Sequence, residues 1–254
     1  MKTWNIREEM TVKKIVALFL CLLFCSGAFA LAEETWSCRE CGMENYGNYC
    51  EYCGAEKATE DWTCPACGSR NAKLFCPVCG AKRPVPVFWA DLTIRDYGTV
   101  TIRLETEAAP ITAANFIELA GSGFYNGLTF HRIIEGFMMQ GGDPMGNGMG
   151  GSNKTIKGEF AANGVDTGLS HTRGAVSMAR SQSYNSASSQ FFIVHQDSTF
   201  LDGQYAVFGY VTEGMDIVDA VCTGAKPTDG NGSIDPAEQP VIESVTIRVD
   251  KPGA

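Results

Sequence analysis

The segment that decides the fold of this chain is residues 130–144, which read Phe-His-Arg-Ile-Ile-Glu-Gly-Phe-Met-Met-Gln-Gly-Gly-Asp-Pro. Two short segments rich in Phe, Ile and Met, 130–134 and 137–140, flank a Glu-Gly pair, and this arrangement predicts two strands joined by a tight turn. Met138 and Gln140 lie two positions apart and therefore share one face of the second strand.

Alternating apolar and polar residues continue this pattern on both sides. Strands are predicted near residues 100–104 and 245–249, where apolar side chains alternate with polar or charged ones. Because these two runs stand at the two ends of one region, we expect them to join the same sheet. Further short strands are predicted at 174–178, 190–194 and 206–211.

Two helical segments interrupt the strands. The first has Pro110 near its start and Gly121 at its end, with an apolar stripe between them. The second runs from about Met215 to Cys222, before Gly224. Many short strands with two isolated helices favour a mainly β fold, a closed barrel capped by the helices.

The composition is that of a globular and acidic chain. Of the 254 residues, 44% are hydrophobic and 19% are charged, which excludes the disordered and collagen-like classes. Acidic residues outnumber basic ones 29 to 20, and the net charge of −9 opposes binding to a nucleic-acid backbone. We therefore expect no nucleic-acid partner.

Residues 1–32 have the three regions of an export signal: basic residues up to Lys14, an uncharged and mostly apolar run over 15–32, and small residues at its end. Two interpretations stay open. The segment is either a cleaved signal peptide or an anchor, because a run of this length is just long enough to span a bilayer. In both cases the rest of the chain is expected to be exported, and the membrane is a partner only through this segment.

Eight of the eleven cysteines fall within residues 36–83, which contain an internal repeat. Trp36–Gly42 is echoed by Trp62–Gly68, a period of 26 residues. Each repeat holds two Cys-x-x-Cys-Gly elements and resembles one half of a double zinc ribbon. This pattern predicts two structural zinc ions with four thiolate ligands each. The predicted ligands are Cys38, Cys41, Cys50 and Cys53 in the first repeat and Cys64, Cys67, Cys76 and Cys79 in the second.

A disulfide framework is the alternative for these cysteines, since export favours oxidation. A bridge within one Cys-x-x-Cys pair closes a very short loop and stabilises little, so zinc is the preferred interpretation. Zinc with four protein ligands has no open position for a substrate, and we therefore expect a structural module or one that binds a protein partner. A proline-restricted linker at 84–87 separates it from the large domain, predicted at 88–250.

Three linked motifs in the large domain resemble the cyclophilin-type peptidyl-prolyl cis-trans isomerases. They are the segment 130–144, Ser189–Ile193 and Phe200–Gly209, in family order and at family spacing. The resemblance covers about residues 88–250 and implies an eight-stranded barrel closed by two helices, with a proline-binding groove on its outer surface. It also implies isomerisation of proline-containing polypeptides during folding or export, with no cofactor for catalysis.

The residue types in these motifs suit rotation about an X-Pro bond, whose barrier of about 18–20 kcal/mol comes from amide resonance. A guanidinium beside the prolyl nitrogen can donate to the lone pair that develops as resonance is lost, so Arg132 is the predicted catalytic residue. Gln140 and Gln190 are expected to bind the peptide backbone. Apolar side chains are expected to hold the proline ring. They are Phe137, Met138, Phe192 and Leu201.

The resemblance adds His131, Ala179, Arg180, Phe200 and Tyr205 to the substrate site. Phe200 stands where many members carry Trp, whereas Arg180 and Tyr205 are similar to residues of bacterial-type members. His131 is expected to orient the site, because the bond rotation transfers no proton.

The alternative function is that of a binding module. Such a module would capture proline-containing segments and be recruited through the zinc ribbons, and any isomerisation would be incidental. The composition of the segment 225–240, rich in Gly, Asp and Pro, predicts a solvated loop and gives no indication of its function.

Overall fold

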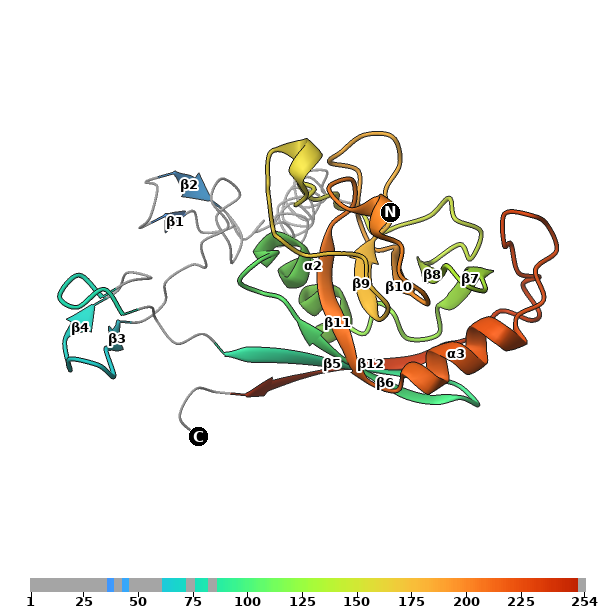
Figure 1. The fold of residues 1–254 in the computed structure, drawn as a ribbon, viewed down its shortest axis with the longest axis horizontal. Helices are drawn as coiled ribbons and strands as arrows, with labels where there is room; N and C mark the ends of the chain where they lie inside the picture. The colour runs from blue at the N-terminus through green and yellow to red at the C-terminus, as the bar shows by residue number, and fades with distance from the viewer. Residues whose placement is uncertain (1–35, 39–42, 46–60, 72–75, 82–85, 251–254) are drawn as a thin grey trace, which may run out of the picture.

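The computed structural model describes residues 36–38, 43–45, 61–71, 76–81 and 86–250 (Figure 1). The predicted export segment at 1–32 and three of the predicted zinc ligands, Cys41, Cys50 and Cys53, lie outside these residues. In the described part of the chain, no helix has both the length and the apolar character needed to cross a membrane.

Residues 86–250 form one curled antiparallel sheet of eight strands in the order β12-β5-β6-β11-β9-β10-β8-β7. The mainly β architecture predicted from the sequence is therefore confirmed. The strands are β5 (Val87–Ile94), β6 (Gly98–Leu104), β7 (Thr129–Ile134), β8 (Met138–Asp143), β9 (Ala175–Met178), β10 (Phe191–Val194), β11 (Val207–Glu213) and β12 (Ile242–Asp250).

The edge strands β7 and β12 close the curl over only a short distance. An isolated bridge joins Thr129 to Val241, and the Ile242 N–H donates to the Leu128 carbonyl at 2.7 Å. Within residues 86–250, no ladder pairs the two strands along their length. The sheet is thus a half-barrel. The closed barrel predicted from the sequence is represented only by this short contact between the edge strands.

The two predicted terminal strands both belong to this sheet, as β6 and β12. They do not pair with each other, because β5 lies between them and pairs with both. The sequence analysis did not single out β5, although Ala90, Leu92 and Ile94 alternate with polar residues and are fully buried. Val87, the last residue of the predicted linker, is the first residue of this strand.

Two helices cover different parts of the sheet: α2 (Pro110–Gly121) packs against β11 and β12, and α3 (Met215–Gly224) packs against β6 and β8 (Figure 1). Both occupy the segments predicted for them. Phe116 of α2 inserts into the main core, with its ring centroid 5.0 Å from those of Tyr125 and Phe208 and 5.4 Å from that of Phe191. This aromatic cluster fixes the inner face of the strands that carry the site on their other face.

The 26-residue repeat is visible as two small sheets with equivalent pairing. In the first, β1 (Trp36–Ser37) pairs with β2 (Glu44–Asn45); in the second, β3 (Trp62–Thr63) pairs with β4 (Arg70–Asn71). The residues that pair in one sheet lie 26 positions from those that pair in the other. Each sheet is too small to be stable alone, so other bonds must hold each repeat together.

Candidate functional site

The site is built on a row of residues that face one another across neighbouring strands. Arg132 on β7 pairs with Gln140 on β8, and Gln140 pairs with Phe192 on β10. Because directly paired residues point to the same face, the row places all three side chains together. The opposite face of β10 carries Phe191 and Ile193 into the main core.

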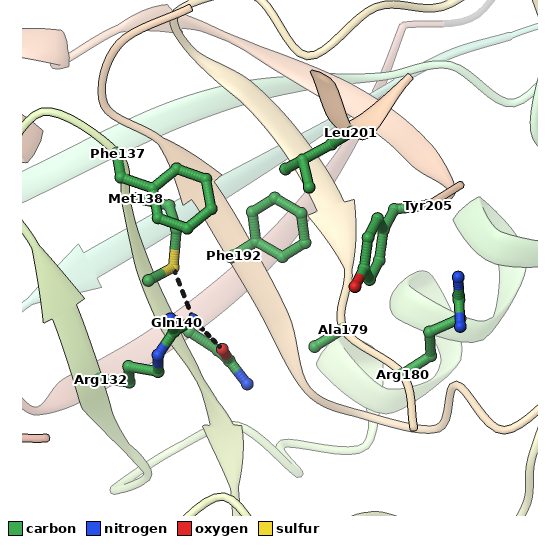
Figure 2. Close-up of a pocket in the computed structure, with 9 residues that line it drawn as sticks. All are labelled: Arg132, Phe137, Met138, Gln140, Ala179, Arg180, Phe192, Leu201 and Tyr205. Carbon is green, nitrogen blue, oxygen red and sulfur yellow. Dashed lines mark hydrogen bonds between the residues drawn. The ribbon is translucent and has the colours of Figure 1, made fainter. Parts of the chain in front are cut away.

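A pocket of about 190 Å³ opens on this face (Figure 2). A second apolar cluster, which includes Met138, Phe192 and Val207, supports its floor. Nine of the predicted site residues line the pocket: Arg132, Phe137, Met138, Gln140, Ala179, Arg180, Phe192, Leu201 and Tyr205. Leu201 comes from η2 (Thr199–Leu201), a short 3-10 helix that the sequence analysis did not predict.

The Arg132 guanidinium is held at one side of the pocket. Its Nε donates to the Asn231 carbonyl at 2.8 Å, and its Nη1 donates to Gln140 Oε1 at 3.3 Å. The Met138 sulfur lies 3.9 Å from Nη1. Burial lowers the pKa of Arg132, but an arginine remains charged at neutral pH. No carboxylate among the described residues forms an ion pair with it, so its charge is available to a ligand.

A chain of amide contacts orients Gln140. Its Nε2 donates to Gln190 Oε1 at 2.9 Å, and Gln190 Nε2 donates to the Gly150 carbonyl at 2.7 Å and to the Gly148 carbonyl at 3.1 Å. This relay turns Gln140 Oε1 toward Arg132. The Asp143 carboxylate folds the loop that provides the two carbonyls by accepting backbone N–H groups within it.

Phe192 rests on a buried histidine that the sequence analysis did not select. The His171 ring stacks on Phe192 with centroids 5.9 Å apart. Its Nδ1 lies 2.7 Å from Asp202 Oδ1 and its Nε2 lies 3.0 Å from Ser177 Oγ. Burial lowers the pKa of His171, although Asp202 opposes this shift. A neutral ring can donate to Asp202 and accept from Ser177, which fixes its orientation beneath Phe192.

Three predicted residues do not line the pocket. Gln190 reaches it through Gln140, as described above. Phe200 is 72% exposed and packs against Phe137 with ring centroids 5.6 Å apart, which extends the apolar rim. His131 is only 5% exposed, and both of its ring nitrogens lack a hydrogen-bond partner. Burial lowers its pKa, so it is a neutral side chain behind the site.

The segment 225–240, from which the sequence analysis drew no functional inference, is largely exposed but contributes a contact to the site. The segment pairs with β7 through the bond from the Ile133 N–H to the Gly232 carbonyl at 2.8 Å, and its Asn231 carbonyl holds Arg132. Gly232 has φ +86°, and a Cβ there would lie 2.5 Å from Ile134. Only glycine allows this approach. A contact made by a backbone carbonyl has no side-chain signature, and the sequence therefore could not reveal it.

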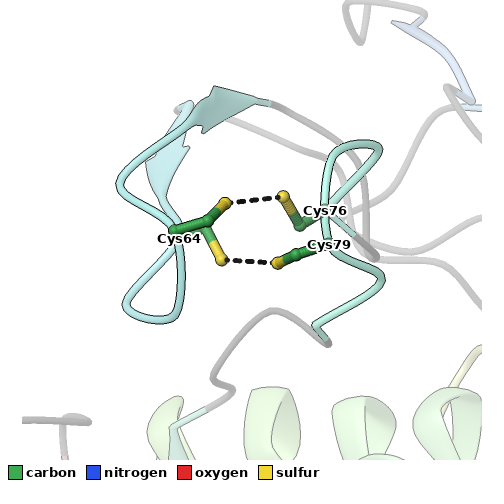
Figure 3. A group of neighbouring side chains, drawn as sticks. Cys64, Cys76 and Cys79 are labelled. Carbon is green, nitrogen blue, oxygen red and sulfur yellow. Dashed lines mark hydrogen bonds between the residues drawn. The ribbon is translucent and has the colours of Figure 1, made fainter.

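A cluster of four cysteine sulfurs lies in the second repeat. The Sγ atoms of Cys64, Cys67, Cys76 and Cys79 all lie within 4.8 Å of one another, a group that could hold a metal ion. The sulfurs of two loops face each other in pairs, Cys64 with Cys79 and Cys67 with Cys76, each pair 3.5 Å apart. Figure 3 shows this group, with Cys64, Cys76 and Cys79 labelled.

The two loops of this cluster have the same hydrogen bonds. The Cys64 N–H donates to the Ser69 carbonyl at 2.9 Å, and the Cys76 N–H donates to the Ala81 carbonyl at 2.8 Å. Cys38 in the first repeat donates in the same way to Met43 at 2.8 Å. Each loop of the cluster turns at a glycine in the left-handed region, Gly68 and Gly80.

A family model described as "cyclophilin type peptidyl-prolyl cis-trans isomerase" matches residues 89–247. The chain belongs to this family. The resemblance seen in its three motifs is confirmed. Similar curated proteins include peptidyl-prolyl cis-trans isomerase B of Bacillus subtilis, 45% identical over 131 residues that cover 52% of this chain and 88% of that protein. Isomerase B of Escherichia coli is 40% identical over 160 residues, 60% of this chain and 95% of that protein.

Solved structures agree with this assignment. A cyclophilin-type peptidyl-prolyl cis-trans isomerase of Cryptosporidium parvum, crystallised in the presence of the dipeptide Ala-Pro, superposes with a TM-score of 0.57 and 28% identity. The match covers 64% of this chain and 99% of that one. The cyclophilin AquaCyp293 of Hirschia baltica matches with a TM-score of 0.51 at 24% identity, which shows the shared fold alone.

Proposed function

We propose that this cyclophilin accelerates cis-trans rotation of X-Pro bonds in proline-containing polypeptides, with Arg132 as its catalytic residue. The observation that carries the proposal is the position of the Arg132 guanidinium, fixed by Asn231 and Gln140 beside an apolar pocket. The Ala-Pro dipeptide present with the Cryptosporidium parvum relative supports a proline-containing ligand.

The pocket suits the chemistry of the rotation. Phe137, Met138, Phe192 and Leu201 offer a ring-sized apolar surface for the pyrrolidine, while the amide on its amino side turns. As the C–N bond loses its double-bond character, a lone pair develops on the prolyl nitrogen, and a guanidinium N–H of Arg132 donates to it. This bond exists only near the transition state, so it lowers the barrier without tightening the ground state. No covalent bond forms or breaks, and the rotation requires no cofactor.

The substitution Arg132→Ala tests the proposal. We expect kcat/KM for a short X-Pro peptide to fall about 100- to 1000-fold, because one preorganised donor to the transition state is lost, whereas the affinity for the peptide changes little. The matched control is Arg95→Ala, an exposed arginine outside the pocket. The rival function, a proline-binding adaptor with incidental turnover, predicts equal losses of affinity and of kcat/KM.

We further propose that the four cysteines of each repeat hold a structural zinc ion. In a tetrahedral site with Zn–S bonds of about 2.3 Å, neighbouring sulfurs are about 3.8 Å apart. The spacing of 3.5 Å between facing sulfurs in the second repeat is close to this value. Cys64, Cys67, Cys76 and Cys79 would hold one ion, and Cys38, Cys41, Cys50 and Cys53 a second. The ions would tie together loops that have too small a core of their own.

We also propose that the chain is exported, with residues 1–32 as its signal or anchor and the zinc ribbons as a surface for a protein partner. The support is the sequence of this segment, a basic start followed by an uncharged apolar run. If the mass of the intact protein shows that residues 1–32 are missing, cleavage is supported. If the protein is found in the membrane fraction with its full-length mass, anchoring is supported.

A further inference from the structure

The second arginine of the pocket is held apart from the first. Figure 2 shows Arg132 beside Gln140 on one side of Phe192 and Arg180 beyond Tyr205 on the other. The chain carries a net charge of −9, yet among the described residues the pocket lining contains two arginines and no carboxylate. The pocket is therefore locally positive on an acidic protein.

Aromatic rings hold Arg180 in one conformation. Its guanidinium carbon lies 4.6 Å from the ring centroid of Tyr205, 5.1 Å from that of Tyr184 and 5.2 Å from that of Phe160. Its Nε donates to the Gln204 carbonyl at 2.9 Å and its Nη1 to the Ser181 carbonyl, also at 2.9 Å. Because these contacts fix the side chain before a ligand arrives, binding would cost little conformational entropy.

The contacts of Arg180 leave part of its binding capacity unused. All its hydrogen-bond partners in the described part of the chain are neutral carbonyls, and none is a carboxylate. Both N–H groups of Nη2 lack a partner there. A guanidinium pairs best with a carboxylate, which accepts charge-assisted bonds in its plane. A half-buried arginine without a counterion at the end of a substrate pocket is thus a site for an anionic group.

We infer that Arg180 selects polypeptides that carry an acidic side chain close to the proline. This inference rests on the proposed function, because it assigns a substrate class to the same pocket. The proline occupies the apolar part beside Arg132, and an Asp or Glu within two residues of it reaches Arg180. An acidic group near the proline would also be attracted by Arg132, so the selectivity must be tested at Arg180 itself.

The experiment compares paired peptides on the full chain. Each pair differs only by Glu or Gln at one of the two positions before or the two positions after the proline. We expect kcat/KM to favour the Glu peptide by about threefold to tenfold at one or more positions, and less at high salt. Arg180→Gln should bring the ratio to about one, Arg180→Lys should retain part of it, and the control Arg95→Gln should leave it unchanged.

The outcomes separate the two ideas. A ratio near one at all four positions in the unmodified protein, or a preference that survives in a folded Arg180→Gln variant, would overturn the role of Arg180 while leaving the isomerase intact. Failure to isomerise the Gln peptides at all would instead count against the proposed function. Near-ultraviolet circular dichroism of Arg180→Gln and Arg180→Lys shows whether each variant keeps its aromatic packing.

Discussion

At the scale of single residues, His131 is the least satisfied side chain near the site. It lies next to Arg132 in the sequence, is buried, and neither of its ring nitrogens has a hydrogen-bond partner. Burial lowers its pKa, while Asp143 opposes the shift and Arg132 adds to it. Its cationic form is therefore disfavoured in the folded state relative to the unfolded chain, where the pKa is near 6.5.

This shift predicts a loss of stability in mild acid. A folded-state pKa below the unfolded value contributes stability above about pH 6.5 that is lost as the pH falls from there toward the folded-state pKa. His131 contributes a slope of up to about 1.4 kcal/mol per pH unit in that window. We expect His131→Leu to flatten the dependence, as measured by urea unfolding between pH 7.5 and 5.5.

Other titrating groups cancel in the comparison with the unmodified protein. His171 also has a lowered pKa, and it contributes equally to the pH dependence of the unfolding free energy in the unmodified protein and in the His131 variants. His131→Gln, which retains a polar side chain without a titrating group, should give the same flattening as His131→Leu. An unchanged slope in both variants would mean that His131 is not forced to remain neutral on folding.

At the scale of elements, the segment 227–235 acts on Arg132 although it lies far away in the sequence. The Asp229 carboxylate folds it by accepting from the N–H groups of Asn231 and Ser233, each at 2.9 Å, and from the Ser233 hydroxyl at 2.8 Å. This fold turns the Asn231 carbonyl toward Arg132 Nε. Asp229 is therefore a positioning residue, with no contact to the pocket of its own.

We expect Asp229→Ala to lower kcat about tenfold with little change in KM, because the guanidinium loses its fixed orientation while the apolar socket remains. Asp229→Asn should recover most of the activity, since its amide oxygen can accept the two backbone N–H bonds and its NH2 group can donate to the Ser233 hydroxyl, both without the charge. Asp235→Ala is the matched control, because this exposed carboxylate at the end of the segment accepts, among the described residues, only from the Ala237 N–H, which lies beyond the segment. If kcat falls equally in the Ala and Asn variants, Asp229 acts on Arg132 through its charge and not through its hydrogen bonds.

Such contacts explain which parts of the site the sequence could predict. The three motifs, through the family resemblance that they carry, led to Arg132, Gln140 and Phe192. Alternation of period two supported the shared faces of Met138 with Gln140 and of Gln190 with Phe192. The sequence pattern also located α2 between Pro110 and Gly121. It could not find the Asn231 carbonyl or the aromatic contacts of Arg180, which depend on loops brought together only by the complete fold.

At the scale of the whole molecule, the described residues of the pocket all belong to the large domain, between Arg132 and Tyr205. None comes from the cysteine repeats. The repeats also carry the only described group of three or more His, Cys, Asp or Glu residues that could hold a metal ion. Isomerisation and the proposed zinc binding of the repeats should therefore be separable in the intact protein.

Native mass spectrometry of the intact, unreduced chain tests this separation. We expect two zinc ions per chain, since eight thiolates in two groups satisfy two tetrahedral sites, and Cys76→Ser should reduce the number to one. Cys222→Ser is the control, because this buried thiol lies in α3, outside the cluster. Removal of zinc by a chelator should leave kcat/KM for a short X-Pro peptide within about twofold, because four-ligand zinc takes no part in catalysis. A measured mass that corresponds to four disulfides and no metal would contradict the zinc sites. A large loss of activity on chelation would contradict the independence of the isomerase domain from the cysteine repeats.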